Sequence, residues 1–163
     1  MFSYDIQALA RRVVEEAAAR GVTVACAESC TGGLVAGAIT AVPGSSVALD
    51  RGFVTYSNAA KTGMLGVPAD LIDAHGAVSE PVARAMAEGA LRHSDAGVSV
   101  AVTGVAGPGG GSPEKPVGLV HFAAAGPAGL IHVEHRFGDI GRDAVRLESV
   151  RTALGLLLDR IGA

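Results

Sequence analysis

Three clusters of polar and glycine residues each follow a segment that reads as a β-strand. The first spans Glu28 to Gly33, with the sequence Glu-Ser-Cys-Thr-Gly-Gly. In open α/β sheets, ligands bind beyond the carboxyl ends of strands, and the N–H groups at a helix start attract anions and developing oxyanions. A hydroxyl such as that of Ser29 is a reasonable nucleophile there. In the other interpretation, Ser29 or Thr31 only caps the next helix, and Gly32 and Gly33 allow tight packing.

The second cluster runs from Tyr56 to Lys61, with the sequence Tyr-Ser-Asn-Ala-Ala-Lys. Because it follows the next strand, Tyr56 is expected near the same sheet edge as Ser29. Lys61 falls in the first turn of a predicted helix, where its charge opposes the helix dipole. Both that position and burial lower the pKa of a lysine, which favours a neutral amine that can act as a general base. The alternative is a solvated surface lysine.

The ratio of lysine to arginine gives weak support to Lys61 as a general base. Of the 13 basic residues, only Lys61 and Lys115 are lysine, and the others are arginine. Because arginine stays charged in proteins, it cannot serve as a base. A lysine at position 61 therefore indicates a need for a removable proton.

The third cluster, Thr103 to Ser112, contains Gly104 and several further glycines. It lacks the Gly-Lys-Ser/Thr ending of a phosphate-binding P-loop and the Gly-x-Gly-x-x-Gly pattern of dinucleotide-binding proteins. Glycines permit close approach of a backbone to a ligand, and a flexible surface loop is the alternative. His132 and His135 face opposite sides of a predicted strand and make a poor metal pair, so no metal site is expected. Cys30 is a rival nucleophile, although both cysteines read best as small buried hydrophobic residues.

The elements around these clusters alternate between helices and strands. Apolar spacing and terminal residues predict helices over 4–20, from about 31 to 42, from 57 or 58 to 65, after Pro68, over 79–93 and over 142–161, and strands over 22–28, 49–57, 97–103, 117–125 and 129–137. Ser3 and Ser79 are the expected caps of their helices. The last two strands read as an antiparallel hairpin, so we expect an α/β domain with a mixed sheet.

Composition excludes several classes of protein. The 163 residues correspond to a single domain, 1–163, and 49% hydrophobic residues argue against disorder. With a net charge of −3, the chain lacks the excess of basic residues that nucleic-acid binding requires. Two cysteines cannot form a disulfide scaffold. The amino terminus does not resemble a signal peptide, and the longest uncharged stretch is broken by glycine and proline. We therefore expect a cytoplasmic protein that does not span a membrane.

Five ordered motifs together resemble the CinA C-terminal domain, the nicotinamide-nucleotide amidase (NMN deamidase) family. They are residues 27–33, 51–58 with Lys61, 76–79, 103–108 and 115–118. The resemblance covers nearly the whole chain, and it implies the stand-alone form without the additional N-terminal domain of larger members. It also implies a three-layer α/β/α sandwich with a mixed, mostly parallel sheet. One departure is the segment Gly138 to Arg142, which reads Gly-Asp-Ile-Gly-Arg where the family commonly has Gly-Asp-Arg, and this puts a role for Arg142 in doubt.

The resemblance implies hydrolysis of nicotinamide mononucleotide to nicotinate mononucleotide and ammonia, in recycling of pyridine nucleotides, without a metal or cofactor. Ser29 is the expected nucleophile, and Lys61 removes its proton directly or through Tyr56. N–H groups from Cys30 to Gly33 are expected to bind the oxyanion. The expected substrate-binding residues are Cys30, Thr31, Gly32, Gly33, Asn58, Thr103 and Gly104.

Two other functions stay open at this point. One is a non-catalytic nucleotide-binding module linked to competence or DNA damage. The other is a thiol hydrolase that uses Cys30. An Ala/Leu face on the last helix would suit either a homo-oligomer surface or the core.

Overall fold

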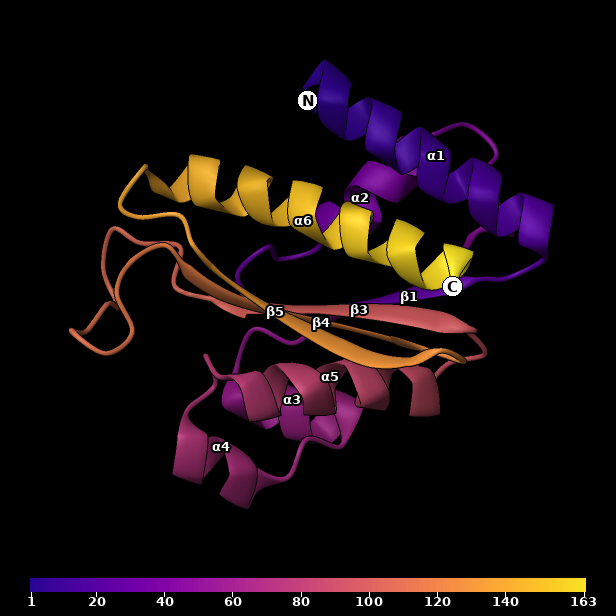
Figure 1. The fold of residues 1–163 in the computed structure, drawn as a ribbon. Coiled ribbons are helices and arrows are strands. Elements are labelled where there is room, and N and C mark those ends of the chain that lie inside the picture. Colours follow the sequence, from indigo (N-terminus) through magenta and orange to yellow (C-terminus); the bar gives the residue numbers. More distant parts are fainter.

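The computed structural model describes residues 1–163 and has three layers (Figure 1). The elements are, in chain order, α1 (Tyr4–Arg20), β1 (Val24–Glu28), α2 (Leu34–Thr40), a 3₁₀ turn (Ser45–Val47), β2 (Leu49–Val54), α3 (Asn58–Leu65), α4 (Ala69–His75), α5 (Glu80–Arg92), β3 (Val98–Gly104), β4 (Leu119–Gly126), β5 (Gly129–Arg136) and α6 (Arg142–Gly162). Helices α1, α2 and α6 cover one face of the sheet, and α3, α4 and α5 cover the other. The predicted three-layer α/β/α sandwich is confirmed.

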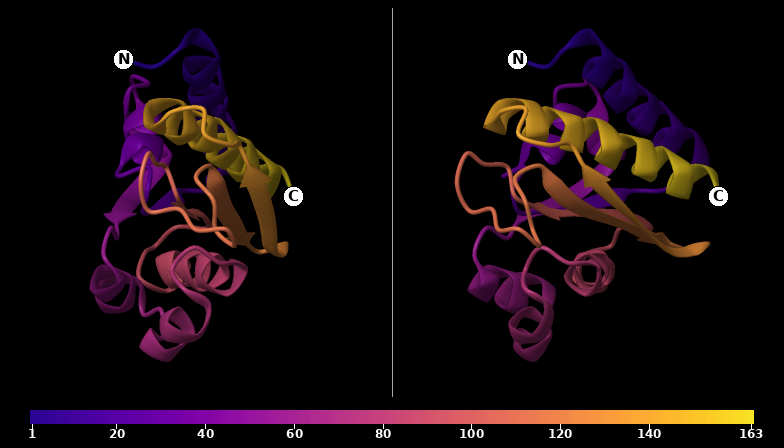
Figure 2. Two further views of the ribbon diagram at one scale, coloured as in Figure 1. Left: turned by 90° about the vertical axis from the view of Figure 1, so that its left-hand side faces the viewer. Right: turned by 60° about the vertical axis from the view of Figure 1, so that its left-hand side comes forward.

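The sheet has the order β2-β1-β3-β4-β5. Strand β1 pairs in parallel with both β2 and β3, whereas β4 pairs antiparallel with β3 and β5. The sheet is therefore mixed, with a parallel core and the predicted hairpin at one side. Because the three parallel strands end at the same edge, the segments after β1, β2 and β3 meet there. Figure 2 turns this end toward the viewer and shows the loop after β3 between the start of α6 and the helices α3 and α4.

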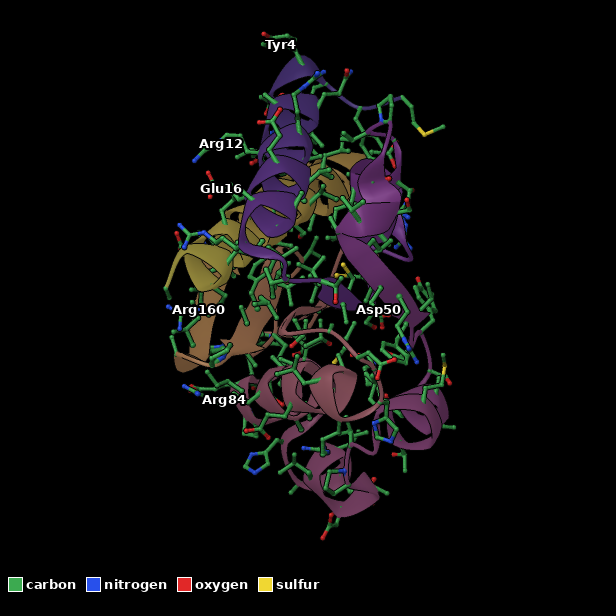
Figure 3. The ribbon with its side chains drawn as sticks, turned by 90° about the vertical axis from the view of Figure 1, so that its right-hand side faces the viewer. Tyr4, Arg12, Glu16, Asp50, Arg84 and Arg160 are labelled. Atoms are coloured by element: carbon green, nitrogen blue, oxygen red, sulfur yellow. The ribbon has the colours of Figure 1, made fainter.

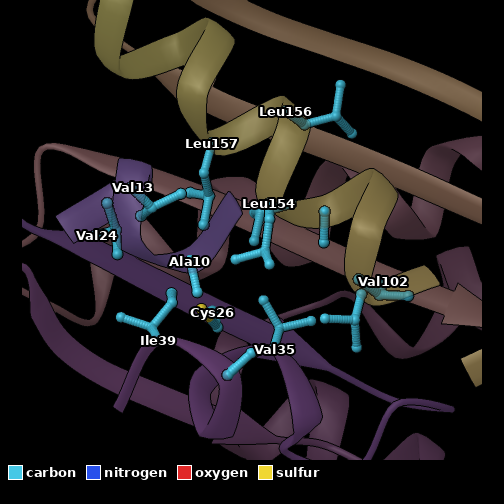
Figure 4. Packing of buried hydrophobic residues seen from close by; sticks show 14 of the residues in the cluster. Ala10, Val13, Val24, Cys26, Val35, Ile39, Val102, Leu154, Leu156 and Leu157 are labelled. Atoms are coloured by element: carbon cyan, nitrogen blue, oxygen red, sulfur yellow. The ribbon is translucent and has the colours of Figure 1, made fainter. Parts of the chain in front are cut away.

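The two faces of the sheet are packed with side chains of different size. Valine, leucine and isoleucine dominate the core under α1, α2 and α6, part of which is shown in Figure 4. On the other face, the sheet offers Ala25, Ala27, Ala101, Ala123 and Ala125 to the alanine-rich helix α5. Seen from the end opposite the converging loops (Figure 3), Arg12 and Glu16 stand away from the core on the outer side of α1.

Two expected helix caps are wrong in detail. Ser3 and Ser79 occupy the N-cap positions of α1 and α5, but neither side chain accepts a hydrogen bond from its helix. The Ser3 hydroxyl accepts a hydrogen bond from Arg151 instead, and that of Ser79 donates to the carbonyl of Gly76. A tertiary partner replaces capping at Ser3, and a local contact within the preceding turn replaces it at Ser79. Strand β2 also ends at Val54 and not at residue 57, although the Thr55 N–H still donates to the Glu28 carbonyl.

The start of α2 is held by the buried carboxylate of Glu28, the last residue of β1. Its Oε2 accepts hydrogen bonds from the N–H groups of Gly33 and Val35 at 3.1 and 3.0 Å, and its Oε1 accepts from that of Ala36 at 2.9 Å. A carboxylate at a helix N-terminus satisfies N–H groups that have no partner within the helix and interacts favourably with the dipole. Glu28 therefore fixes the geometry of the turn that follows Ser29.

Replacing Glu28 with glutamine should destabilise the fold. The Glu28→Gln amide would keep one acceptor but place its NH₂ group against a backbone N–H, so we expect a loss of about 3 kcal/mol in the free energy of unfolding, measured with urea. Glu15→Gln is the matched control, because Glu15 is exposed on α1, and it should stay within about 0.5 kcal/mol of the unchanged protein. Equal effects of the two substitutions would contradict the role assigned to Glu28.

Candidate active site

Ser29 and Lys61 are in direct contact at the carboxyl edge of the sheet. Ser29 continues β1 by one residue, because its N–H donates to the Val102 carbonyl of β3. Strand residues alternate between faces, so Ser29 points away from the α2 side that Glu28 occupies. The Nζ atom of Lys61 lies 3.0 Å from the Ser29 Oγ and donates to the Thr55 carbonyl at 2.9 Å. The sheet edge and α3 together bring the two side chains into contact.

Helix α3 carries Lys61 to this position. The Ser57 hydroxyl caps the helix by accepting a hydrogen bond from the Ala60 N–H at 3.0 Å. This places Lys61 one turn into the helix, on its inner face, where only 1% of the side chain is exposed. The alternative of a solvated surface lysine is wrong.

Burial sets the protonation of Lys61. Loss of solvation lowers the pKa of the Lys61 amine below its usual value. The neutral amine has two N–H bonds and one lone pair. One N–H donates to the Thr55 carbonyl, which leaves the lone pair free to accept the Ser29 hydroxyl proton. The direction of the shift agrees with the prediction, and burial is its cause.

A cavity of about 300 Å³ opens beside this pair. It is lined by Ser29, Cys30, Tyr56, Asn58, Lys61, Ala77, Val78, Thr103, Gly104, Val105, Ala106, Gly107, Gly109, Gly110 and Arg142. All three predicted clusters thus contribute to one cavity. No carboxylate and no imidazole lines it, and Lys61 is the ionisable side chain that is hydrogen-bonded to Ser29.

Three of the predicted substrate-binding residues lie outside the cavity lining. Gly32 and Gly33 adopt positive φ angles of 57° and 100°, which turn the chain from β1 into α2. Their N–H groups are already used, by the Ser29 carbonyl and by Glu28. Thr31 is completely buried. The N–H groups of Cys30 and Thr31 are hydrogen-bonded to no protein group, but only Cys30 also lines the cavity, so its N–H is the candidate oxyanion donor.

Tyr56 is at the rim of the cavity and not between Ser29 and Lys61. Its side chain is 61% exposed, and its hydroxyl accepts a hydrogen bond from Arg142 Nη2 at 2.9 Å. Arg142 Nη1 also donates to the Gly107 carbonyl at 2.8 Å. The guanidinium thus links Tyr56 to the glycine-rich loop, and proton transfer from Ser29 to Lys61 needs no relay through the phenol.

Two arginines at the start of α6 are parts of the site that sequence reasoning did not assign. Arg142 lines the cavity despite the altered segment before it. Arg146, one turn later, donates to the carbonyls of Cys30 and Thr31 at 3.1 and 3.3 Å and so orients their peptide groups. Their spacing of four residues, which places them on one face of the predicted helix, is the signal that could have identified them.

The cysteines and histidines take other roles. Burial raises the pKa of the Cys30 thiol to about 11, which disfavours a thiolate. Nδ1 of His121 lies 2.9 Å from Nε2 of His132 on the α5 side of the sheet, and neither ring lines the cavity. No group of three or more histidine, cysteine, aspartate or glutamate side chains is placed to hold a metal ion. No helix combines the length and the apolar character needed to cross a bilayer.

The buried amine should leave a signature in the pH dependence of stability. A lysine in the unfolded chain titrates near 10.5, and the folded pKa of Lys61 is lower. Between these two values the unfolded state binds more protons, so the stability of the unchanged protein rises with pH in that window. Lys61→Met lacks this contribution. As the pH is raised from neutral toward 10.5, the Tm of the unchanged protein should therefore rise relative to the Tm of Lys61→Met.

Differential scanning calorimetry at a series of pH values measures this difference. Lys115→Met, which removes the only other lysine and changes the net charge equally, serves as the control and should not reproduce the trend. A Lys61→Met difference that stays constant or grows with pH would contradict a lowered pKa.

Comparison with known proteins agrees with this architecture. The family model described as "CinA C-terminal domain" matches residues 6–161. A CinA-like protein of Anaeromyxobacter sp. (strain K) is 60% identical over 146 residues, which cover 89% of this chain and 35% of that protein. A CinA-like protein of Synechococcus sp. (strain RCC307) is 54% identical over 157 residues, which cover 96% of this chain and 38% of that protein. The chain thus spans about a third of the length of these curated relatives.

Solved structures match over almost their full length. The competence/damage inducible protein CihA of Agrobacterium tumefaciens superposes with a TM-score of 0.97 at 54% identity, covering 100% of this chain and 99% of that chain. A CinA superfamily protein of Klebsiella pneumoniae gives a TM-score of 0.90 at 35% identity, covering 96% and 98%. With its five-stranded mixed sheet and its match over residues 6–161, the chain belongs to the CinA C-terminal domain family.

Proposed function

We propose that this domain is an amidohydrolase that converts nicotinamide mononucleotide to nicotinate mononucleotide and ammonia through an acyl-enzyme on Ser29. The observation that carries the proposal is the 3.0 Å contact between the Ser29 Oγ and the buried Lys61 Nζ in a cavity without acidic groups. A neutral lysine beside a serine hydroxyl is an activated nucleophile of the kind that amide hydrolysis requires. Family membership supports the same activity.

The reaction follows from the positions of these groups. Ser29 Oγ attacks the carboxamide carbon while Lys61 Nζ takes the hydroxyl proton. The N–H group of Cys30, which lines the cavity and has no partner in the protein, is the available donor for the oxyanion. Lys61 then gives its proton to the departing nitrogen, and the C–N bond breaks to release ammonia. Water, deprotonated by the same amine, attacks the acyl-enzyme, and Ser29 regains its proton as the acid product leaves.

The charge of the cavity favours an anionic substrate. Arg142 is the only lining side chain that is charged while Lys61 is neutral, and no carboxylate opposes it. The N–H groups of Ala106, Gly107, Gly109 and Gly110 are not hydrogen-bonded within the protein. Free amides in a glycine-rich loop beside an arginine are suitable donors for phosphate oxygens. We assign the substrate phosphate to this end of the cavity.

The catalytic pair is tested by Ser29→Ala and Lys61→Arg. Each should lower ammonia release from nicotinamide mononucleotide by at least about a thousandfold, because removing either member of a nucleophile–base pair disables the chemical step. Lys61→Arg keeps the charge but cannot accept a proton, so substantial activity in this variant would exclude the general-base role. Activity retained in Ser29→Ala and lost on alkylation of Cys30 would favour the thiol mechanism instead.

The phosphate assignment is tested by Arg142→Ala. We expect KM for nicotinamide mononucleotide to rise about tenfold or more, because a charge-assisted contact to an anion is lost. KM for nicotinamide riboside, which lacks the phosphate, should change much less, and steady-state assays of ammonia release measure both. Equal effects on the two compounds would contradict the assignment.

A nucleotide-binding module without turnover predicts a different outcome. Such a protein would bind the mononucleotide tightly in calorimetry, with no ammonia formed on prolonged incubation. Ammonia release from free nicotinamide and from the dinucleotide should be measured in the same assay. These two compounds separate recognition of the base from recognition of the single phosphate.

A further inference from the structure

The turn between α4 and α5 is held by three side chains, one from the turn itself and two from distant parts of the chain. The carbonyl of His75 accepts a hydrogen bond from Lys115 Nζ, that of Gly76 accepts from Ser79 Oγ at 2.8 Å, and that of Ala77 accepts from Thr103 Oγ1 at 2.9 Å. Three successive carbonyls are therefore fixed. Ala77 and Val78 of this turn form one wall of the cavity.

Lys115 joins this wall to the glycine-rich loop, which forms another wall of the cavity. It lies at the end of the glycine-rich loop 104–116, whose earlier residues line the cavity. Its backbone closes the loop, because its N–H donates to the Ser112 hydroxyl and its carbonyl accepts from the Ser112 N–H, at 3.0 and 2.9 Å. From this fixed position its ammonium group reaches the last residue of α4, where the carbonyl end of a helix attracts a cation.

The shape of this contact requires a lysine. Gly76 has a φ angle of +77°, and a Cβ atom added to it would lie 2.5 Å from Lys115 Nζ. The ammonium group therefore occupies the space that the missing side chain leaves. A guanidinium is planar and wider than an ammonium ion, so an arginine at position 115 could not fill the same space. This explains why an arginine-rich chain carries its second lysine here.

We propose that Lys115 is a positioning residue that sets the distance between the two walls of the cavity by tying loop 104–116 to the turn 75–79. The effect on catalysis rests on the proposed function, because it concerns binding of the mononucleotide. The effect on the loop does not rest on the proposed function, because the hydrogen bond between Lys115 and His75 forms within the protein without a ligand.

The first measurement is hydrogen exchange without ligand. In Lys115→Met, the amides of Gly76 and Ser112, which donate to the carbonyls of Ile72 and of residue 115, should exchange at least about tenfold faster, since loss of a hydrogen bond to a charged group allows both segments to open. Exchange in β1, β3 and α6 should be unchanged. Exchange that rises evenly along the chain would mean a general loss of stability and would overturn the proposal, as would no change at all.

The second measurement separates KM from kcat. Lys115→Met should raise KM for the mononucleotide about tenfold, because small displacements of binding groups are costly, while kcat changes little since Ser29 and Lys61 are untouched. Lys115→Arg should resemble Lys115→Met although it keeps the charge. Behaviour of Lys115→Arg like that of the unchanged protein would show that any cation suffices and would contradict the argument from Gly76.

Chemical rescue provides the sharpest control. The two native cysteines are buried, and the pKa of the Cys30 thiol is raised to about 11, so the thiol of Lys115→Cys is the one that reacts at mildly alkaline pH. Aminoethylation of that thiol rebuilds a side chain of lysine length with an ammonium group. Propylation gives the same length without the charge. We expect the aminoethylated protein, and not the propylated one, to recover slow exchange and a low KM.

Equal recovery with both reagents, or with neither, would overturn the proposal. If the unchanged protein released no ammonia, the proposed function would fail on its own. Hydrogen exchange and its rescue by aminoethylation would still decide whether Lys115 ties the two walls together.

Discussion

The site depends on the burial of a single amine. Lys61 is the largest side chain that the fold buries completely, and its Nζ has a carbonyl and a hydroxyl as partners but no carboxylate. A carboxylate nearby would stabilise the ammonium form and raise the pKa of the lysine, as in an ordinary ion pair. Without one, desolvation dominates and the neutral amine is favoured. The absence of an acidic partner is thus as necessary to the base as the presence of Ser29.

The acidic residue next to the nucleophile has a structural task. Glu28 precedes Ser29 in the chain, and a carboxylate beside a serine could be taken for its partner in catalysis. Because neighbouring residues of a strand face opposite sides of the sheet, Glu28 is directed toward α2 and Ser29 toward α3. The carboxylate is committed to three N–H groups of the turn and of α2. One strand end therefore supplies the nucleophile on one face and the support for its loop on the other.

Small side chains fill the layer between the sheet and α5. Alanines on the strands and on α5 leave little volume between them, so this helix lies close to the sheet. Helix α3 also approaches α5 closely, since a Cβ atom on Gly89 would lie 2.2 Å from the Leu65 carbonyl oxygen. Small residues here bring Lys61 on α3 to the carboxyl edge of the sheet, and the turn before α5 to the same edge. The small residues at these two contacts are therefore part of how the cavity is assembled.

The elements of the fold and the residues around the cavity were largely predictable from local pattern. Apolar spacing and terminal residues located the six α-helices and the five strands but not the 3₁₀ turn Ser45–Val47. The alternation of elements placed Ser29, Tyr56 and Thr103 at one edge, because parallel strands end together. Local pattern could not reveal that Ser29 contacts Lys61 directly, 32 residues away, that Arg142 binds the Tyr56 hydroxyl, or that Lys115 reaches His75. It also assigned Ser3 and Ser79 to caps that their side chains do not make. Secondary structure follows from interactions between near neighbours in the chain, whereas these contacts depend on the distance and rotation at which whole layers pack, which only the tertiary structure decides.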